Sequence, residues 1–340
     1  MIQDGLSRTD IDLAVSQGVI DRDIADRLLA FAASQRSTSA DEESFRLLTG
    51  FNDIFVTIGL ALFLGATYWL ASNVSTWVAT LAVAISAWAL AEIFTLKRRM
   101  ALPSIVLLAV FVAMIFALIA ELAGSSASFK ANDPVPFVVA GIAAAAGASV
   151  HWRRFHVPIT VAAGFAALAA SAAALANLAI PGILEHQPIL VFLPLGLVAF
   201  GIAMRFDMSD RQRLTRRTDI AFWLHLLAAP LIVHSVVWNI TDPSDLSTVD
   251  SFLIVGLFAV LSLVAIIVDR RALLVSSLSY LIYAAWTLLH MTRWETNGWA
   301  MAILCVGALV LLLSVAWRPM RAGVVRLLPP AIANMVPVAA

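Results

Sequence analysis

The chain has 340 residues, of which 61% are hydrophobic and 13% are charged, and its 22 basic and 22 acidic residues give a net charge of zero. A typical soluble domain is about 25% charged, so this composition, with a mean hydropathy of +0.91, excludes a soluble globular fold. We expect an all-α, polytopic membrane protein, because lipid offers the backbone no hydrogen-bond partner and each spanning segment must therefore be helical.

The amino-terminal segment differs from the rest of the chain, since residues 1–36 are polar and predict a small cytoplasmic helical hairpin. Thr9 fits the N-cap of a capping box that begins a first helix. Gly18 fits the left-handed residue that ends it. Asp21 then caps a second helix with apolar residues at helical spacing. Residues 37–51 follow as a polar linker and an interfacial helix.

Apolar segments long enough to cross a hydrocarbon core of about 30 Å follow one another along the remaining chain. We predict ten transmembrane helices, forming a bundle over residues 52–317, and a cytoplasmic tail over residues 318–340. The predicted spans lie near 52–71, 76–96, 102–122, 134–150, 157–178, 188–204, 218–238, 251–268, 272–290 and 299–317.

The hairpin and the first span together carry a family resemblance. Its residues are Gly18-Val19-Ile20-Asp21 in the hairpin, the glycine-bounded stretch Gly59-Leu60-Ala61-Leu62-Phe63-Leu64-Gly65, and the ending Trp69-Leu70-Ala71-Ser72-Asn73. Over about residues 6–77 the chain resembles a bacterial family of predicted membrane proteins, catalogued as domain of unknown function number twenty-one fifty-seven. The resemblance implies a bacterial inner-membrane location and a cytoplasmic hairpin, and it implies no activity.

The basic residues of the loops predict the orientation, because lysine and arginine accumulate on the cytoplasmic side of a membrane. With ten spans and a cytoplasmic amino terminus, all of the 22 basic residues except Lys130 and Arg293 fall on the cytoplasmic side. Both termini are therefore predicted to be cytoplasmic.

Small residues at four-residue spacing mark the fourth and fifth spans. They are Gly141, Ala145 and Ser149, then Ala162, Ala166, Ala170 and Ala174. Such faces let two helix backbones approach closely in a membrane. We expect these two helices to pack tightly.

Ionisable residues within spans are candidates for function, because charge is costly in lipid. Glu92 lies near the inner end of the second span, within reach of Lys97, and is read as an interfacial residue. His225 lies inside the seventh span and is expected to be a neutral packing residue bonded to a backbone carbonyl or a hydroxyl. His151 and Arg153 are read as part of an inner loop at which arginines contact lipid headgroups.

One face of the seventh span is the candidate cavity lining. Asp219, Trp223, Pro230 and His234 fall within a narrow sector of the helical wheel. Pro230 frees a backbone carbonyl on the same side. This face suits a water-accessible path, and the alternative is that its two polar ends merely reach the two interfaces.

Enzyme motifs are missing from the sequence, which contains no HExxH, P-loop, GxGxxG or GxSxG pattern. Its single cysteine, Cys305, excludes an intramolecular disulfide and a CxxC site. We expect no enzyme activity, no cofactor, no metal and no nucleic-acid partner.

Three functional classes remain open for a protein whose one evident partner is the lipid bilayer. The first is a transporter or flippase for a small or amphipathic molecule, favoured because ten spans exceed what an anchor needs. The second is a regulatory or assembly protein that acts through residues 1–36, docked on the basic loop from Arg205 to Arg217 or on a cytoplasmic protein. A membrane enzyme ranks last.

Overall fold

A computed structural model describes residues 8–27, 29, 51–124, 133–213, 215–240, 247–290, 297–333 and 335–337. The chain divides into two compact units, residues 1–45 and residues 46–339. The described residues contain helices and turns and no strand, in agreement with the predicted all-α class.

The amino-terminal unit contains helix α1 (Arg8–Ser16) and a second helical stretch at residues 22–27. Gly18 lies between them with φ of +68°, the left-handed conformation expected at the end of a helix. Thr9 lies inside α1 and not before it, so the predicted N-cap position is wrong. The predicted linker and most of the interfacial helix lie outside the described residues.

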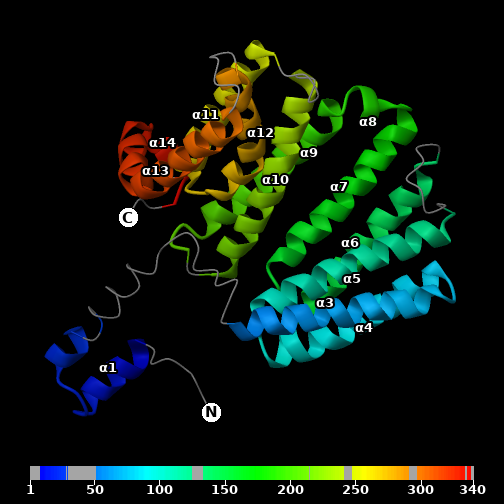
Figure 1. The fold of residues 1–340 in the computed structure, drawn as a ribbon. Coiled ribbons are helices and arrows are strands. Elements are labelled where there is room, and N and C mark those ends of the chain that lie inside the picture. The colour runs from blue at the N-terminus through cyan, green and yellow to red at the C-terminus, as the bar shows by residue number, and fades with distance from the viewer. Residues whose placement is uncertain are drawn as a thin grey trace. The chain divides into compact units, whose positions relative to one another are not determined.

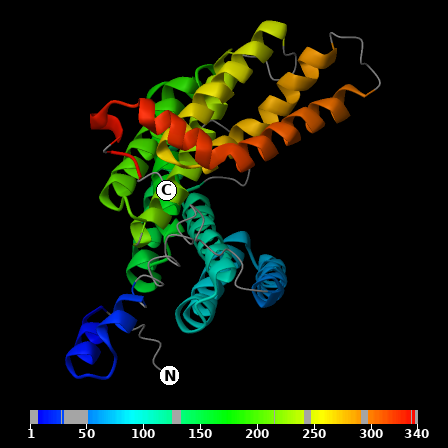
Figure 2. The same ribbon diagram turned by 90° about the vertical axis from the view of Figure 1, so that its left-hand side faces the viewer.

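Among the described residues of the second unit, ten helices are long and apolar enough to cross a membrane, one for each predicted span. Figures 1 and 2 show their arrangement. They are α3 (Phe51–Ser72), α4 (Thr76–Ala91) with its π-helical extension η1 (Glu92–Lys97), α5 (Ala101–Leu122), α6 (Val135–Phe155), α7 (Ile159–Ala179), α9 (Ile189–Ser209), α10 (Arg216–Ile240), α11 (Thr248–Val268), α12 (Ala272–His290) and α13 (Gly298–Leu327). Two short helices, α8 (Ile183–His186) and α14 (Pro330–Ala333), complete the described elements. We call the end at which α3 begins the inner end, and the opposite end the outer end, after the orientation predicted from charge.

Three helices continue past their predicted inner ends. The predictions ended α6 at residue 150, α9 at 204 and α13 at 317, whereas the helices run to Phe155, Ser209 and Leu327. Each extension carries a charged residue paired with another helix or loop: Arg154 on α6, Asp207 on α9 and Arg321 on α13. Hydropathy places a boundary where charge begins, but a helix can continue there when its charges are paired.

Glycine allows close approach at two helix pairs. At Gly141 of α6, an added Cβ would lie 2.5 Å from the carbonyl oxygen of Ala167 on α7. The Ser171 hydroxyl of α7 donates a 2.8 Å hydrogen bond to the Val138 carbonyl of α6. The predicted tight packing of the fourth and fifth spans is confirmed. Gly196 of α9 makes a similar approach to α10, where an added Cβ would lie 2.7 Å from the side chain of Ile232.

The ten long helices form two sequential halves of five. In the first half α3, α4, α5, α6 and α7 pack against one another, and in the second α9 to α13 do the same. Helix α7 joins the halves by packing against both α9 and α10. We call this boundary the seam, and it positions the cavities described below.

Candidate functional site

Small and aliphatic side chains pack across the seam near its inner end. Ala162 of α7 packs in one cluster with Ala203 of α9 and Leu224 of α10, and all three are buried. Phe165 of α7 and Phe206 of α9 pack against the same cluster. Dispersion forces hold such an apolar contact without directional bonds. The two halves can therefore slide or separate there at a smaller free-energy cost than at a contact made of ion pairs.

A cavity of about 350 Å³ lies at the outer end of the seam, and we call it the outer cavity. Its walls come from both halves: Phe116 of α5, Phe137 of α6, three alanines and Asn177 of α7, then Leu184, Glu185 and Phe192. Asp133 and Glu185 lie at the exposed rim, while Ala173 and Ala174 are buried in the floor. Apolar walls with a few polar groups are the usual lining of a small-molecule site.

A second cavity, of about 360 Å³, lies at the inner end of the same seam, and we call it the inner cavity. Residues of α6 and α7 line one side, among them Ala148, Arg153 and Thr160, and Ile202 of α9 and Leu224 of α10 line the other. Leu224 and Phe165 belong both to this lining and to the apolar cluster, so the cluster borders the inner cavity. The seam therefore has a cavity at each end.

The neighbouring side cavity, of about 350 Å³, contains two of the residues predicted to line a path. Pro230 and His234 of α10 lie there with Phe192, which also borders the outer cavity. The His234 ring nitrogen Nδ1 lies 2.6 Å from the hydroxyl oxygen of Tyr280. Trp223 instead packs against the seam cluster, and Asp219 lies half-buried near the start of α10. The continuous path along these four residues stays a prediction.

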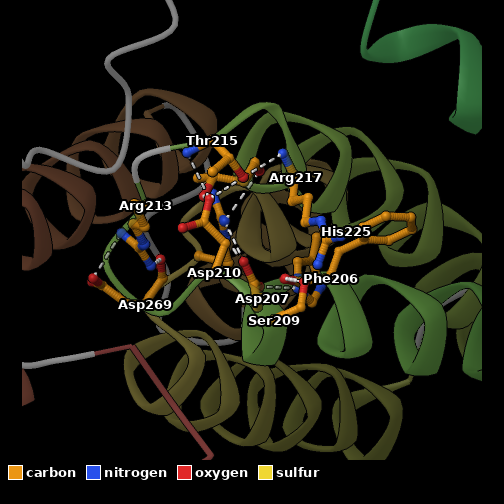
Figure 3. A network of polar contacts seen from close by, with 11 residues as sticks. Phe206, Asp207, Ser209, Asp210, Arg213, Thr215, Arg217, His225 and Asp269 are labelled. Atoms are coloured by element: carbon orange, nitrogen blue, oxygen red, sulfur yellow. Dashed lines mark hydrogen bonds and ion pairs between the residues drawn. The ribbon is translucent and has the colours of Figure 1, made fainter.

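A buried ion pair clamps the second half together near its inner end. Asp207 of α9 receives hydrogen bonds from Arg270, which lies between α11 and α12, and its Oδ2 atom is 2.9 Å from Nε2 of His225 on α10 (Figure 3). All three side chains are at most 1% exposed. Arg270 also donates to the carbonyl oxygen of Thr218, at 3.2 Å.

These contacts correct one expectation. His225 is buried as expected, but its partner is a carboxylate and not a carbonyl or a hydroxyl. Arg270, one of the basic residues counted on the cytoplasmic side, is 1% exposed. Neither His225 Nδ1 nor Arg270 Nη1 has a hydrogen-bond partner in the described part of the chain.

A second ionic cluster extends this clamp to α13. Asp269 pairs with Arg213 at 3.0 Å and with Arg321 at 3.4 Å, and accepts a 2.8 Å hydrogen bond from the Trp317 indole nitrogen. Arg321 also donates to the carbonyl oxygen of Pro337. The clamp therefore joins the α9–α10 loop, the α11–α12 loop and the carboxyl-terminal part of the chain. It occupies Arg213, one of the loop arginines that were expected to serve as a docking surface.

The first half contains an ion pair between two helices, and this pair is partly exposed. Arg154 of α6 donates two hydrogen bonds to Glu92 at the end of α4, at 2.9 and 2.8 Å. Glu92, which was expected to lie within reach of Lys97, thus also pairs with an arginine of another helix. His151 lies inside α6 and not in a loop, is 1% exposed, and contacts the rings of Trp88, Phe111 and Phe155. The ion pairs of Glu92, Asp207 and Asp269 named above each join segments of a single half.

Within the described residues, no group of three or more histidine, cysteine, aspartate or glutamate side chains could hold a metal ion. No protein-family model matches the chain, no curated protein is similar to it, and no solved structure is similar to it. The family resemblance of the amino-terminal region stays a prediction.

Proposed function

We propose that this protein is a carrier or flippase of the bacterial inner membrane that moves a small amphipathic molecule as its two halves rock against each other. Both termini are cytoplasmic in this proposal, and the protein is not an enzyme. The observation that carries it is the seam, which has a cavity at each end with walls supplied by both halves, and an apolar contact beside the inner cavity.

The distribution of polar contacts supports rigid movement of each half. Arg154 and Glu92 link α6 to α4 in the first half, and Asp207, Arg270 and Asp269 link the helices of the second half. The seam cluster, by contrast, consists of apolar side chains such as Ala162 and Leu224. Two internally packed bodies that meet at an apolar contact are what a rocking transition requires.

A rocking carrier exposes its site to one side at a time. If the halves separate at the outer end, the outer cavity widens and the inner end closes on Ala148 and Arg153. The opposite movement exposes the inner cavity and closes the outer one. A solute in the seam would then pass from one cavity to the other without a continuous pore.

Reciprocal thiol labelling tests this proposal. In a Cys305→Ala background, Ala173→Cys places a thiol in the outer cavity and Ala148→Cys places one in the inner cavity. Modifying the first with a bulky maleimide from outside should hold the outer end open. We expect the labelling rate of the second from the inner side to fall, because the two openings exclude each other.

The control is Gly323→Cys, at an exposed position on α13, whose labelling rate should not change. Equal labelling of Ala148→Cys with and without the outer maleimide would contradict alternating access. Labelling of Ala173→Cys from the cytoplasmic side alone would show that the bundle has the opposite orientation to the one proposed.

A regulatory or assembly protein is the second candidate, and one observation favours it. Residues 1–45 form a separate compact unit in which Leu13, Val19 and Ile24 are exposed apolar side chains. Exposed apolar residues on a small helical unit suit a protein partner. Under this alternative, cysteines in the two cavities would be labelled independently of each other. Deleting residues 1–40 would abolish partner binding and leave the bundle intact.

A further inference from the structure

The outer cavity combines an apolar aromatic interior with an acidic rim. Phe116 and Phe137 stack with ring centroids 6.3 Å apart, and Phe192 lines the same space. Asp133 and Glu185 are the two charged side chains among the described lining residues, and both are carboxylates. We propose that this cavity binds a monovalent organic cation with an apolar body, which would be the substrate class of the carrier proposed above.

The two acids come from segments that lie far apart in the sequence but converge at one opening. Asp133 precedes α6, and its Oδ1 atom accepts a 3.1 Å hydrogen bond from the Val135 amide, which fixes the carboxylate at the mouth. Glu185 lies on α8, just before α9. Two carboxylates in the lining of one cavity attract a cation to it.

The interior suits the apolar body of such a ligand. Ala170, Ala173 and Ala174 present methyl groups, so a flat or bulky group meets no large obstruction from α7. The phenylalanine faces add attraction for an ammonium group, because the ring quadrupole is negative on its face. Low-dielectric walls also concentrate the field of the rim carboxylates, which raises the local concentration of cations and lowers that of anions.

The inner cavity has the opposite character. Its described lining includes Arg153 and no acid. A cation that reached the inner end would meet a like charge there and would be held less tightly. The charge difference between the two cavities therefore favours binding at the outer end and release at the inner end.

Isothermal titration of the full-length protein in lipid nanodiscs tests this site, with empty nanodiscs subtracted. The probes are benzyltrimethylammonium and benzylsulfonate, which share a benzyl group and carry opposite charges. We expect saturable binding of the cation and none of the anion. Asp133→Asn with Glu185→Gln should weaken cation binding by roughly tenfold, since one rim carboxylate contributes roughly twofold to fivefold.

Two control variants keep the test specific. Glu121→Gln removes an acid at the outer end of α5 that is not among the described lining residues, and should leave the affinity unchanged. Lys130→Gln removes the basic residue nearest to Asp133 in the sequence, and should leave cation binding equal or stronger. Equal binding of both probes, or an unchanged affinity in the double variant, would overturn the cation site.

The proposal about substrate class and the proposal about transport fail in different ways. If no cation binds but the two cavities are labelled reciprocally, the cation-site proposal is wrong and the carrier proposal is supported. If cation binding responds to the rim variants but the two cavities are labelled independently, the cation site is supported and alternating access is contradicted.

Discussion

Replacing Arg270 by alanine is expected to lower the free energy of unfolding of the bundle by about 3–5 kcal/mol, because it leaves Asp207 as a buried carboxylate without its guanidinium partner. Asp207 is 1% exposed and would keep the His225 imidazole as its described side-chain partner. The thermal unfolding temperature in a mild detergent measures the loss. Asp207→Asn should also be destabilising, since it leaves Arg270 buried without a counter-ion.

The exposed pair in the other half provides a matched control. Arg154 and Glu92 also form a two-bond arginine–carboxylate contact, but their side chains are 52% and 31% exposed. Solvent can replace that contact, so Arg154→Ala should leave the unfolding temperature nearly unchanged. Equal decreases in unfolding temperature for Arg270→Ala and Arg154→Ala would show that burial does not determine the strength of these two ion pairs.

Replacing Gly141 by alanine is expected to destabilise the first half by about 1–3 kcal/mol, the usual cost of inserting a group into a well-packed contact. The new methyl group would lie 2.5 Å from the Ala167 carbonyl oxygen and 2.6 Å from the Ser171 Cβ atom. Both neighbours belong to α7 near its backbone and cannot turn away as a long side chain could. The α6–α7 pair would have to separate.

Gly59→Ala on α3 is the control for this variant, because an added Cβ there meets nothing within 4 Å. Alanine is the better helix former by about 1 kcal/mol, so this change should be neutral or stabilising. The thermal unfolding temperatures of the two variants test this difference in stability. A stabilised Gly141→Ala protein would mean that α6 and α7 do not approach as closely as described.

The ten spans could be predicted from the sequence because each depends on local information, namely a run of apolar residues long enough to cross lipid. The α6–α7 contact was also predictable, since the spacing of Gly141 and Ala145 is itself a packing signal. Helix ends were less predictable where a charge is paired, as at Asp207.

The buried clamp could not be derived from sequence, because it depends on pairing across long separations. Nothing local distinguishes Arg270, which is buried, from the other arginines of the inner loops. His225 was the available signal, since an ionisable residue inside a span requires a polar partner. That partner, Asp207, lay beyond the predicted end of its own span and was assigned to a loop.

The outer cavity was missed for a related reason. Asp133 precedes the fourth span and Glu185 lies between the fifth and sixth predicted spans, and only the packing of the helices brings them to one opening. The prediction concentrated on the face of α10, where a helical wheel can be drawn from a single segment. Of that set, Pro230 and His234 do line a cavity, adjacent to the outer one and sharing Phe192 with it.

Spin-label distances across the seam test the central claim most directly. One pair of labels, at Leu178 of α7 and Asn239 of α10, spans the outer end, and a second pair, at Arg153 of α6 and Arg205 of α9, spans the inner end; all four positions are exposed. In nanodiscs, each pair should show two distances, and conditions that lengthen one should shorten the other. A third pair within the second half, at Arg205 and Arg318, should show one unchanged distance. A single fixed distance for both seam pairs, or movement within the third pair, would contradict rigid halves that rock about the seam.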